Sequence, residues 1–211
     1  MTTHIIWDWN GTILNDVQHA VDVMNRLLQA EGLPSLAVPR YRDLFRFPVR
    51  SYYEDLGFSV NDEEFLTVAN AFMDGFESGI RDCGLRPGVR SSLQRFQEMG
   101  LSQSILSAAK QDSLREQVRH HGIDGHFEEV LGLDNHYAAG KTEVGLGWVE
   151  RGLHPVEKTI FVGDTCHDFE VARSMGVRCV LVADGHQARS RLSECGCPVI
   201  DSIEDLPAFL S

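Results

Sequence analysis

The sequence has no apolar stretch long enough to cross a lipid bilayer, since a spanning helix needs about 20 consecutive apolar residues. It has no low-complexity run, and the MTTH before the first apolar segment is not the basic stretch that opens a secretory signal. We therefore expect a cytoplasmic protein with no membrane partner. Its 211 residues, 43% of them hydrophobic, suffice for one well-buried domain carrying a smaller insertion.

Positive charge is scarce in this chain, and lysine is the scarcer of its two cations. Lysine and arginine together number 19, against 31 aspartates and glutamates, so the formal net charge is −12. This balance argues against non-specific binding to nucleic acids and to anionic membranes. The lysines are Lys110, Lys141 and Lys158. We expect a small-molecule partner and no nucleic acid, and either a monomer or a homodimer.

Cysteines are few and lack the spacing of a disulfide framework. Their number is odd, which fits reduced thiols in a reducing compartment. The alternative, a metal or redox pair at the CxC of residues 195–197, has no second pair to complete it, so we favour ordinary thiols. The nine histidines include no zinc-binding spacing such as HExxH.

Short apolar segments alternate with helical periodicity over most of the chain. Six segments are expected to be strands: Ile5–Asp8, Ser104–Ser107, Glu128–Leu133, Thr159–Asp164, Cys179–Asp184 and Pro198–Asp201. Helical periods lie near residues 88–99, 111–121, 141–152, 167–175 and 187–195. This alternation predicts an α/β fold with a doubly wound, parallel, Rossmann-like sheet.

The alternation fails between residues 15 and 85, where two amphipathic helices are expected instead. Apolar residues recur there at helical spacing over 17–28 and again over 65–76. We predict a helical insertion at 15–85, placed after the first strand of a core formed by 1–14 and 86–211. The alternative is that these helices only extend the core.

Four polar segments fall where predicted strands end. The first, DWNGT at residues 8–12, directly follows the first strand. The others are Ser107 at the end of a strand, Lys141 at the start of a helix, and GDTCHD at 163–168. Each is a weak signal alone. Because the carboxyl ends of strands form the ligand-binding edge of an open α/β sheet, we expect the four segments to meet in one site.

These residue types supply what phosphoryl transfer from a monoester requires. The carboxylate of Asp8 can attack phosphorus and form an aspartyl-phosphate. Mg²⁺ prefers hard oxygen ligands, and Asp164 and Asp168 can present two carboxylates in one direction across a strand-to-helix turn. The cation offsets repulsion between nucleophile and phosphate. Ser107 and Lys141 can hold the phosphoryl oxygens.

The four segments resemble motifs one to four of the haloacid dehalogenase superfamily, in its phosphatase branch with a helical cap inserted after motif one. Similarity to phosphoglycolate phosphatase-like members extends to FRFP at 45–48 and DGH at 184–186. The resemblance covers essentially the whole chain. It implies a Mg²⁺-dependent phosphatase of small phosphorylated metabolites, with a phosphoglycolate-like substrate.

The resemblance also implies roles for the motif residues. The expected metal ligands are Asp8, Asn10 through its backbone carbonyl, Asp164 and Asp168. The expected substrate-binding residues of the core are Thr12, Ser107 and Lys141. Asp8 is expected to be the nucleophile as well, and Asp168 either binds the metal directly or orients a metal-bound water and Lys141. Asp8, Asn10 and Lys141 are the expected catalytic residues.

Asn10 departs from the phosphatase pattern, which has an aspartate that protonates the leaving oxygen and later activates water. An amide cannot exchange a proton at neutral pH, although it still donates a hydrogen bond. Since general acid–base catalysis contributes about 10²–10⁴-fold, we expect slowed chemistry, most for alkyl phosphates and least for aryl or acyl phosphates. The alternative is that water or a neighbour such as His167 supplies the proton.

Two other enzyme classes of this superfamily also lack that aspartate. Phosphonoacetaldehyde hydrolases resemble this motif, but they need a cap lysine for a Schiff base, and residues 15–85 contain none. Dehalogenases carry an aromatic residue in place of Asn10 and use no Mg²⁺, and the pair Asp164 and Asp168 argues against them. A catalytically weak, ligand-binding or regulatory protein stays open as an alternative, although the retained nucleophile argues against it.

The predicted cap carries a local excess of positive charge. Arg40, Arg42, Arg46 and Arg50 stand close together with the single acid Asp43. Arginine suits bidentate recognition of carboxylate or phosphate. One of them could bind a second anionic group of a small phosphorylated acid, and Arg46 is our candidate. Pairing with surface acids is the equally open alternative.

Overall fold

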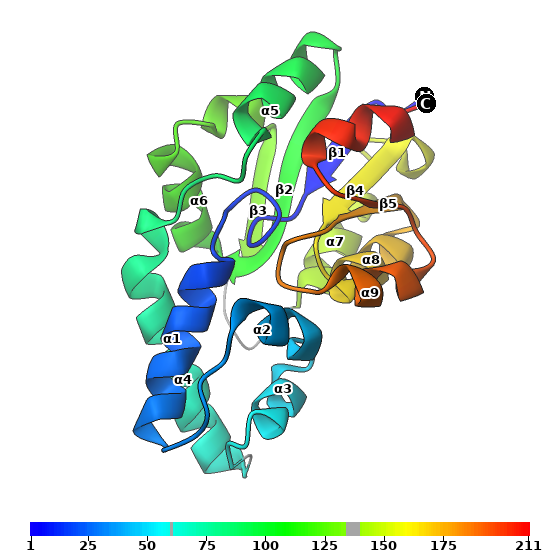
Figure 1. Ribbon diagram of the computed structural model, residues 1–211. Coiled ribbons are helices and arrows are strands. Elements are labelled where there is room, and N and C mark those ends of the chain that lie inside the picture. Colours follow the sequence, from blue (N-terminus) through cyan, green and yellow to red (C-terminus); the bar gives the residue numbers. More distant parts are fainter. Residues whose placement is uncertain (60, 134–139) are drawn as a thin grey trace.

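The protein, seen in a computed structural model, is built on a sheet of six parallel strands (Figure 1). The structure describes residues 1–59, 61–133 and 140–211. The strands are β1 (His4–Trp7), β2 (Ser102–Lys110), β3 (Glu129–Leu133), β4 (Thr159–Gly163), β5 (Arg178–Val182) and β6 (Val199–Ile200). Their order is β3-β2-β1-β4-β5-β6, and the predicted α/β fold is confirmed. No helix in the described ranges has the length and apolar character needed to cross a membrane.

The strands divide their side chains between two hydrophobic layers. Ile5 and Trp7 of β1 enter one layer and Ile6 the other, as the alternation of side chains along a strand requires. The first layer is covered by α5 (Val89–Glu98), α6 (Gln111–His120) and the 3-10 helix η5 (Ile203–Phe209). The second is covered by α7 (Lys141–Glu150), α8 (Cys166–Met175) and α9 (Arg189–Leu192). The shorter 3-10 helices are η2 (Asp124–His126), η3 (Val156–Lys158) and η4 (Ser193–Cys195).

The helices that follow β1 pack around a third hydrophobic cluster of their own. They are α1 (Val17–Ala30), α2 (Val38–Leu44), α3 (Val49–Asp55), α4 (Asp62–Gly79) and the 3-10 helix η1 (Ile80–Asp82). Met24 and Leu28 of α1 and Tyr52 of α3 are buried in this cluster. Figure 1 shows α1–α4 gathered beyond one end of the sheet. α1 and α4 correspond to the two expected amphipathic helices, whereas α2 and α3, with 7 residues each, are too short to show a clear period.

The chain leaves the sheet and returns to it through two segments that lie side by side. Leu14 and Leu85 form an antiparallel bridge between them. Next to this bridge, the guanidinium of Arg86 donates to the carbonyl oxygens of Gly11 at 2.5 Å and Ala183 at 2.8 Å. Both ends of the helical group are therefore fixed at the turn that follows β1.

All five cysteines are free. The two thiols of the CxC segment have different neighbours, because Cys195 hydrogen-bonds with Cys166 and Cys197 with Cys179.

The two glycines of α7 offer a matched pair of substitutions. A Cβ at Gly145 would lie 2.7 Å from the sulfur of Met175 and 3.2 Å from a methyl of Leu106, whereas one at Gly147 would meet nothing within 4 Å. We expect Gly147→Ala to raise the free energy of unfolding by up to about 1 kcal/mol through helix propensity. Gly145→Ala should lower it by about 1–3 kcal/mol through overpacking. Urea denaturation measures both, and equal changes would contradict this packing of α7.

Candidate active site

Predicted site residues converge at the carboxyl end of the sheet, where the helices α1–α4 cover it. β1 lies between β2 and β4 in the middle of the sheet, and ligands of open α/β sheets bind in the crevice at such a point. A cavity of about 190 Å³ lies there. Five of the predicted residues line it: Asp8, Asn10, Ser107, Lys141 and Asp168.

Lys141 holds two of the carboxylates together. It opens α7, is only 4% exposed, and its ammonium donates to Asp8 Oδ1 and, at 2.5 Å, to Asp168 Oδ1. Burial alone would lower the pKa of Lys141, but the two carboxylates raise it above its usual value. The lysine therefore stays charged, and removing it would leave two buried carboxylates uncompensated.

The turn from β4 into α8 presents Asp168. Thr165 is the N-cap of α8 and Asp168 its N3 residue, and the two form a capping box. One carboxylate oxygen of Asp168 accepts from the Thr165 N–H at 2.9 Å and from the Thr165 hydroxyl at 2.7 Å. The other oxygen is left for Lys141. A Cβ on Gly163 would lie 2.4 Å from the Asp168 side chain, so this turn requires glycine.

Asp164 is fully buried and fixed from several sides. Its Oδ1 accepts from the Thr12 hydroxyl at 2.8 Å, and its Oδ2 accepts from the His186 backbone N–H at 2.6 Å. Gly11 and Gly185 allow two loops to pass close by, because a Cβ on them would lie 2.4 and 2.2 Å from Oδ2. Thr12, expected to bind substrate, therefore has its hydroxyl on Asp164 and is not among the described residues that line the cavity.

Asp8, Asp164 and Asp168 form a group that suits a divalent cation. Carboxylate oxygens, one from each, lie within 4.8 Å of one another. Burial raises the pKa of Asp8 and of Asp164, and the Asp168 carboxylate adds to both effects. Burial would also raise the pKa of Asp168, but Lys141 holds it below its usual range. Three carboxylates facing one ammonium leave an excess of negative charge, and hard oxygen donors fit Mg²⁺.

A second group of metal-ligand side chains, His4, Glu128 and His154, involves the start of β1 at the opposite edge of the sheet. The imidazoles of His4 and His154 are stacked, with ring centroids 3.8 Å apart and planes 21° apart. Because nitrogen lone pairs lie in the ring plane, stacked rings direct them side by side rather than toward one ion. The carboxylate group is therefore the candidate metal site.

A buried aspartate holds the amide of Asn10. Asn10 Nδ2 donates to Asp16 Oδ2 at 2.8 Å, and the Gly11 N–H donates to Asp16 Oδ1 at 2.7 Å. On the other side, Asp16 Oδ1 lies 3.3 Å from Nε2 of His186, whose Nδ1 lies 2.7 Å from the Tyr41 hydroxyl. The carboxylate that the resemblance leads one to expect at position 10 is thus found 6 residues later, in contact with the amide.

Asp16 and His186 form a buried ion pair. Burial alone would lower the pKa of His186, but Asp16 raises it to about 9. Burial alone would raise the pKa of Asp16, but His186 holds it below its usual range. Asp16, Tyr41 and His186 were not among the predicted site residues. A signal for His186 existed, because DGH at 184–186 follows a strand that ends at the same edge.

Ser107 and Arg46 have different positions relative to the cavity. Ser107 lines it, and its hydroxyl accepts from the Ala109 N–H at 3.1 Å. Arg46 pairs with Asp55 at 2.5 Å and also donates to the Ser51 carbonyl oxygen at 3.4 Å. It is not among the described lining residues. Its contact with a substrate stays a prediction.

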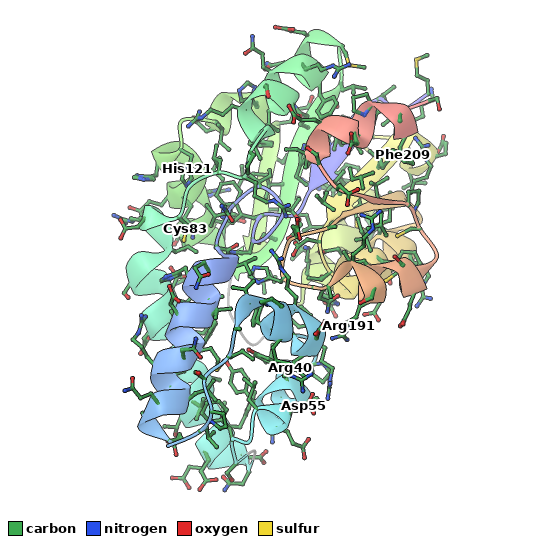
Figure 2. The ribbon with its side chains drawn as sticks, viewed as in Figure 1. Arg40, Asp55, Cys83, His121, Arg191 and Phe209 are labelled. Carbon is green, nitrogen blue, oxygen red and sulfur yellow. The ribbon has the colours of Figure 1, made fainter. Side chains whose placement is uncertain are left out.

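The α2 region is fastened to the loop that follows β5. Arg42 donates to the carbonyl oxygens of Asp184 at 2.6 Å and Gly185 at 2.9 Å. Arg191 of α9, labelled beside α2 in Figure 2, donates to the carbonyl oxygen of Phe45 at 2.9 Å. These contacts hold the helical group over the cavity.

The Rossmann-like sheet and the acidic, lysine-containing site at its carboxyl edge define the class of protein to which this chain is compared. The sequence pattern of the haloacid dehalogenase-like hydrolase family matches residues 5–182. The chain belongs to this family, and the membership expected from its four motifs is confirmed.

Relatives of this chain are similar at low identity. Phosphoglycolate phosphatase of Vibrio parahaemolyticus is 24% identical over 181 residues, which cover 82% of this chain and 79% of the relative. Tyrosine-protein kinase PtkA of Mycobacterium tuberculosis is 24% identical over 183 residues, 86% of this chain and 62% of the relative. A haloacid dehalogenase-like hydrolase structure from Streptococcus pneumoniae has a TM-score of 0.85 at 16% identity, covering 100% of this chain and 99% of the other. Family and relatives support an enzyme of the phosphoric monoester hydrolase class.

The contact between Asn10 and Asp16 predicts how an aspartate at position 10 is tolerated. Asn10→Asp brings a second carboxylate to a site 2.8 Å from buried Asp16, and like charges so placed disfavour each other. We expect this variant to lower the free energy of unfolding at pH 7 by about 1–3 kcal/mol. The double variant Asn10→Asp/Asp16→Asn should be more stable than the two single changes predict by addition. Urea denaturation in EDTA measures all three.

Asn10→Ala is the matched control for this series, because it removes the amide and adds no charge. A double variant whose stability equals the sum of the single changes would show that the two side chains are not coupled.

The carboxylate group predicts stabilisation by Mg²⁺. A ligand that binds only the folded state at 100 times its Kd raises the free energy of unfolding by about 2.7 kcal/mol. We expect Mg²⁺ to raise the melting temperature of the wild type and to have little effect on Asp164→Asn. Asp22→Asn, an exposed carboxylate on α1, is the control and should respond as the wild type does. Equal responses from the wild type and Asp164→Asn would place the cation elsewhere.

Proposed function

We propose that the protein is a cytoplasmic, Mg²⁺-dependent phosphatase that hydrolyses small phosphorylated metabolites through an aspartyl-phosphate. The observation that carries this proposal is the buried ammonium of Lys141, in contact with Asp8 and Asp168 at the wall of a cavity. A carboxylate nucleophile needs positive charge beside it when an anionic phosphate approaches. Lys141 supplies this positive charge.

The described residues supply the nucleophile and the phosphate-binding groups for both half-reactions, the formation of the aspartyl-phosphate and its hydrolysis. A carboxylate oxygen of Asp8 attacks phosphorus while the bond from phosphorus to the ester oxygen breaks, and the leaving oxygen takes up a proton from water. Water then attacks the aspartyl-phosphate at phosphorus, which releases inorganic phosphate and restores the Asp8 carboxylate. Lys141 and the Ser107 hydroxyl bind phosphoryl oxygens in both steps.

The metal ligands in this proposal are Asp8, the backbone carbonyl of Asn10, Asp164 and Asp168. Bound Mg²⁺ supplies charge neutralisation at the phosphoryl oxygens. Asp168 also positions Lys141, which it contacts at 2.5 Å. Thr12 contributes to the site by fixing Asp164 through its hydroxyl.

We further propose that residues 15–85 act as a cap domain over a core of residues 1–14 and 86–211. The separate hydrophobic cluster of α1–α4 and the bridge between Leu14 and Leu85 support this division. Breaking the contacts of Arg42 with the loop after β5 would open the cap to substrate.

Asn10 limits the rate and the choice of substrate. Its amide donates to Asp16 and has no proton to release at neutral pH. The loss of a general acid slows chemistry by about 10²–10⁴-fold. Phosphoglycolate, the substrate in the name of one relative, has an alkyl leaving group and is therefore a demanding substrate for this site. Arg46 is our candidate for binding its carboxylate, which requires the ion pair with Asp55 to open.

A catalytically weak, phosphate-binding or regulatory protein is the second candidate function. The hydrogen bond from the Asn10 amide to Asp16 favours this second function, because the site then has no free carboxylate at position 10.

Phosphate release separates the two candidates. We expect the wild type to release phosphate from phenyl phosphate, and more slowly from 2-phosphoglycolate, only when Mg²⁺ is present. Asp8→Asn should lose more than about 10³-fold in kcat, because no other group replaces the nucleophile. Asp22→Asn is the control and should keep wild-type rates. Failure to release phosphate from either ester, in protein that binds Mg²⁺ and phosphate by calorimetry, would contradict the phosphatase and leave the binding role.

A further inference from the structure

The helical group gives the cavity a predominantly aromatic wall. Its apolar lining residues include Tyr41, Phe45, Phe47, Phe72, Met73 and Phe76. The rings contact one another in sequence, with centroids 5.2 Å apart for Tyr41 and Phe45 and 5.5 Å apart for Phe45 and Phe47. Phe47 then meets the ring of His167, another lining residue, at 4.9 Å. The result is a continuous surface of rings facing the carboxylates and Lys141.

Two side chains of this wall are partly open to solvent. Phe47 is 44% exposed and Met73 37% exposed. Large apolar side chains exposed at the rim of a cavity mark a surface that a ligand covers. The portion of a substrate that lies against them is therefore apolar.

Among the described residues that line the cavity, Lys141 is held by Asp8 and Asp168 and His186 is paired with Asp16, so neither is free for a second anionic group of a substrate. No arginine is among the described residues that line the cavity. Arg42 is paired with Asp184 at 3.1 Å, and Arg46 with Asp55 at 2.5 Å. The lining acid Glu77 adds negative charge on this side. A substrate carboxylate placed here would lose its hydration without gaining a partner, which is unfavourable.

The size of the cavity is sufficient for an aromatic group. An apolar cavity of about 150 Å³ holds one benzene molecule. The cavity here, about 190 Å³, has room for a single ring.

Asn10 gives an independent chemical reason. An alkoxide must be protonated as it leaves phosphorus, and the Asn10 amide cannot supply that proton. A phenol has a pKa of about 10, as tyrosine does. Water, which stands here for an alcohol, has a much higher pKa of about 15.7. A phenolate can therefore leave as the anion and take its proton from solvent afterwards.

We propose that the substrate of this site is the phosphate monoester of a small phenol, with the ring against Phe47 and Met73 and the phosphoryl group at Lys141. The proposal rests on the phosphatase function above. In the first step the Asp8 oxygen–phosphorus bond forms and the aryl oxygen–phosphorus bond breaks, with its electron pair staying on the phenolate oxygen. Offset or edge-to-face contacts with the wall hold the ring.

The first test measures binding without chemistry, so that the reactivity of the ester plays no part. Phenylphosphonate and phosphonoacetate carry the same phosphonate group and cannot be hydrolysed at a phosphorus–oxygen ester bond. We expect phenylphosphonate to bind the Mg²⁺-loaded wild type at least about ten-fold more tightly by calorimetry, because its ring is buried against the wall.

Variants of the wall locate this preference. Phe47→Ala and Met73→Ala should each weaken phenylphosphonate binding several-fold and leave the binding of inorganic phosphate unchanged. Both side chains are partly exposed, so these variants should fold. Leu66→Ala is the control, because Leu66 is an exposed apolar residue of α4 outside the cavity lining. Met73→Arg adds the missing cation and should shift the preference toward phosphonoacetate.

Turnover provides the second test. We expect kcat/KM for phenyl phosphate to exceed that for 2-phosphoglycolate by at least about 100-fold, the lower end of the contribution of a general acid. Phosphonoacetate binding as tightly as phenylphosphonate, or Phe47→Ala behaving as Leu66→Ala does, would overturn the aromatic substrate while the phosphatase stands. Hydrolysis of neither ester would overturn the phosphatase itself, and the substrate with it.

Discussion

The contact of the buried Lys141 ammonium with Asp8 and Asp168 is the interaction on which the rest of the site depends. Carboxylates gathered in a protein interior disfavour folding unless positive charge compensates them, and this lysine supplies that charge. Neighbouring residues position this contact. The capping box at the start of α8 orients the Asp168 side chain, and Gly163, which has no Cβ, leaves space for it. The negative charge that remains is what makes the site receptive to a divalent cation.

A second buried charge pair lies next to the first motif. Asp16 accepts from the amide of Asn10 and pairs with His186. A carboxylate is therefore present beside Asn10, but it is engaged in an ion pair, and the residue at position 10 has no proton to give. In the function that we propose, such a site favours leaving groups that depart as stable anions, and the aromatic lining of the cavity matches such groups in polarity.

Much of the fold was predictable because it depends on local patterns. Buried parallel strands must be apolar on both faces, so each of the six strands shows in the sequence. Five polar residues of the cavity lining were predictable too, because strands of a parallel sheet end at the same edge. The short helices α2 and α3 were not, since 7 residues give too few turns for a period. Arg46 shows a further limit, because its ion pair with Asp55 depends on how the segment between α2 and α3 packs against α3.

The sequence by itself determined the family, the parallel sheet and the set of polar residues at its carboxyl edge, because periodicity and motif spacing are properties of neighbouring residues. Only the tertiary structure decided which partners those residues have. Tyr41 and His186 are 145 residues apart and meet only because the helical group closes over the sheet. The same closure forms the ring-lined wall and joins the segments that carry Asn10, Asp16 and His186. Such contacts follow from how distant segments pack, which no local pattern records.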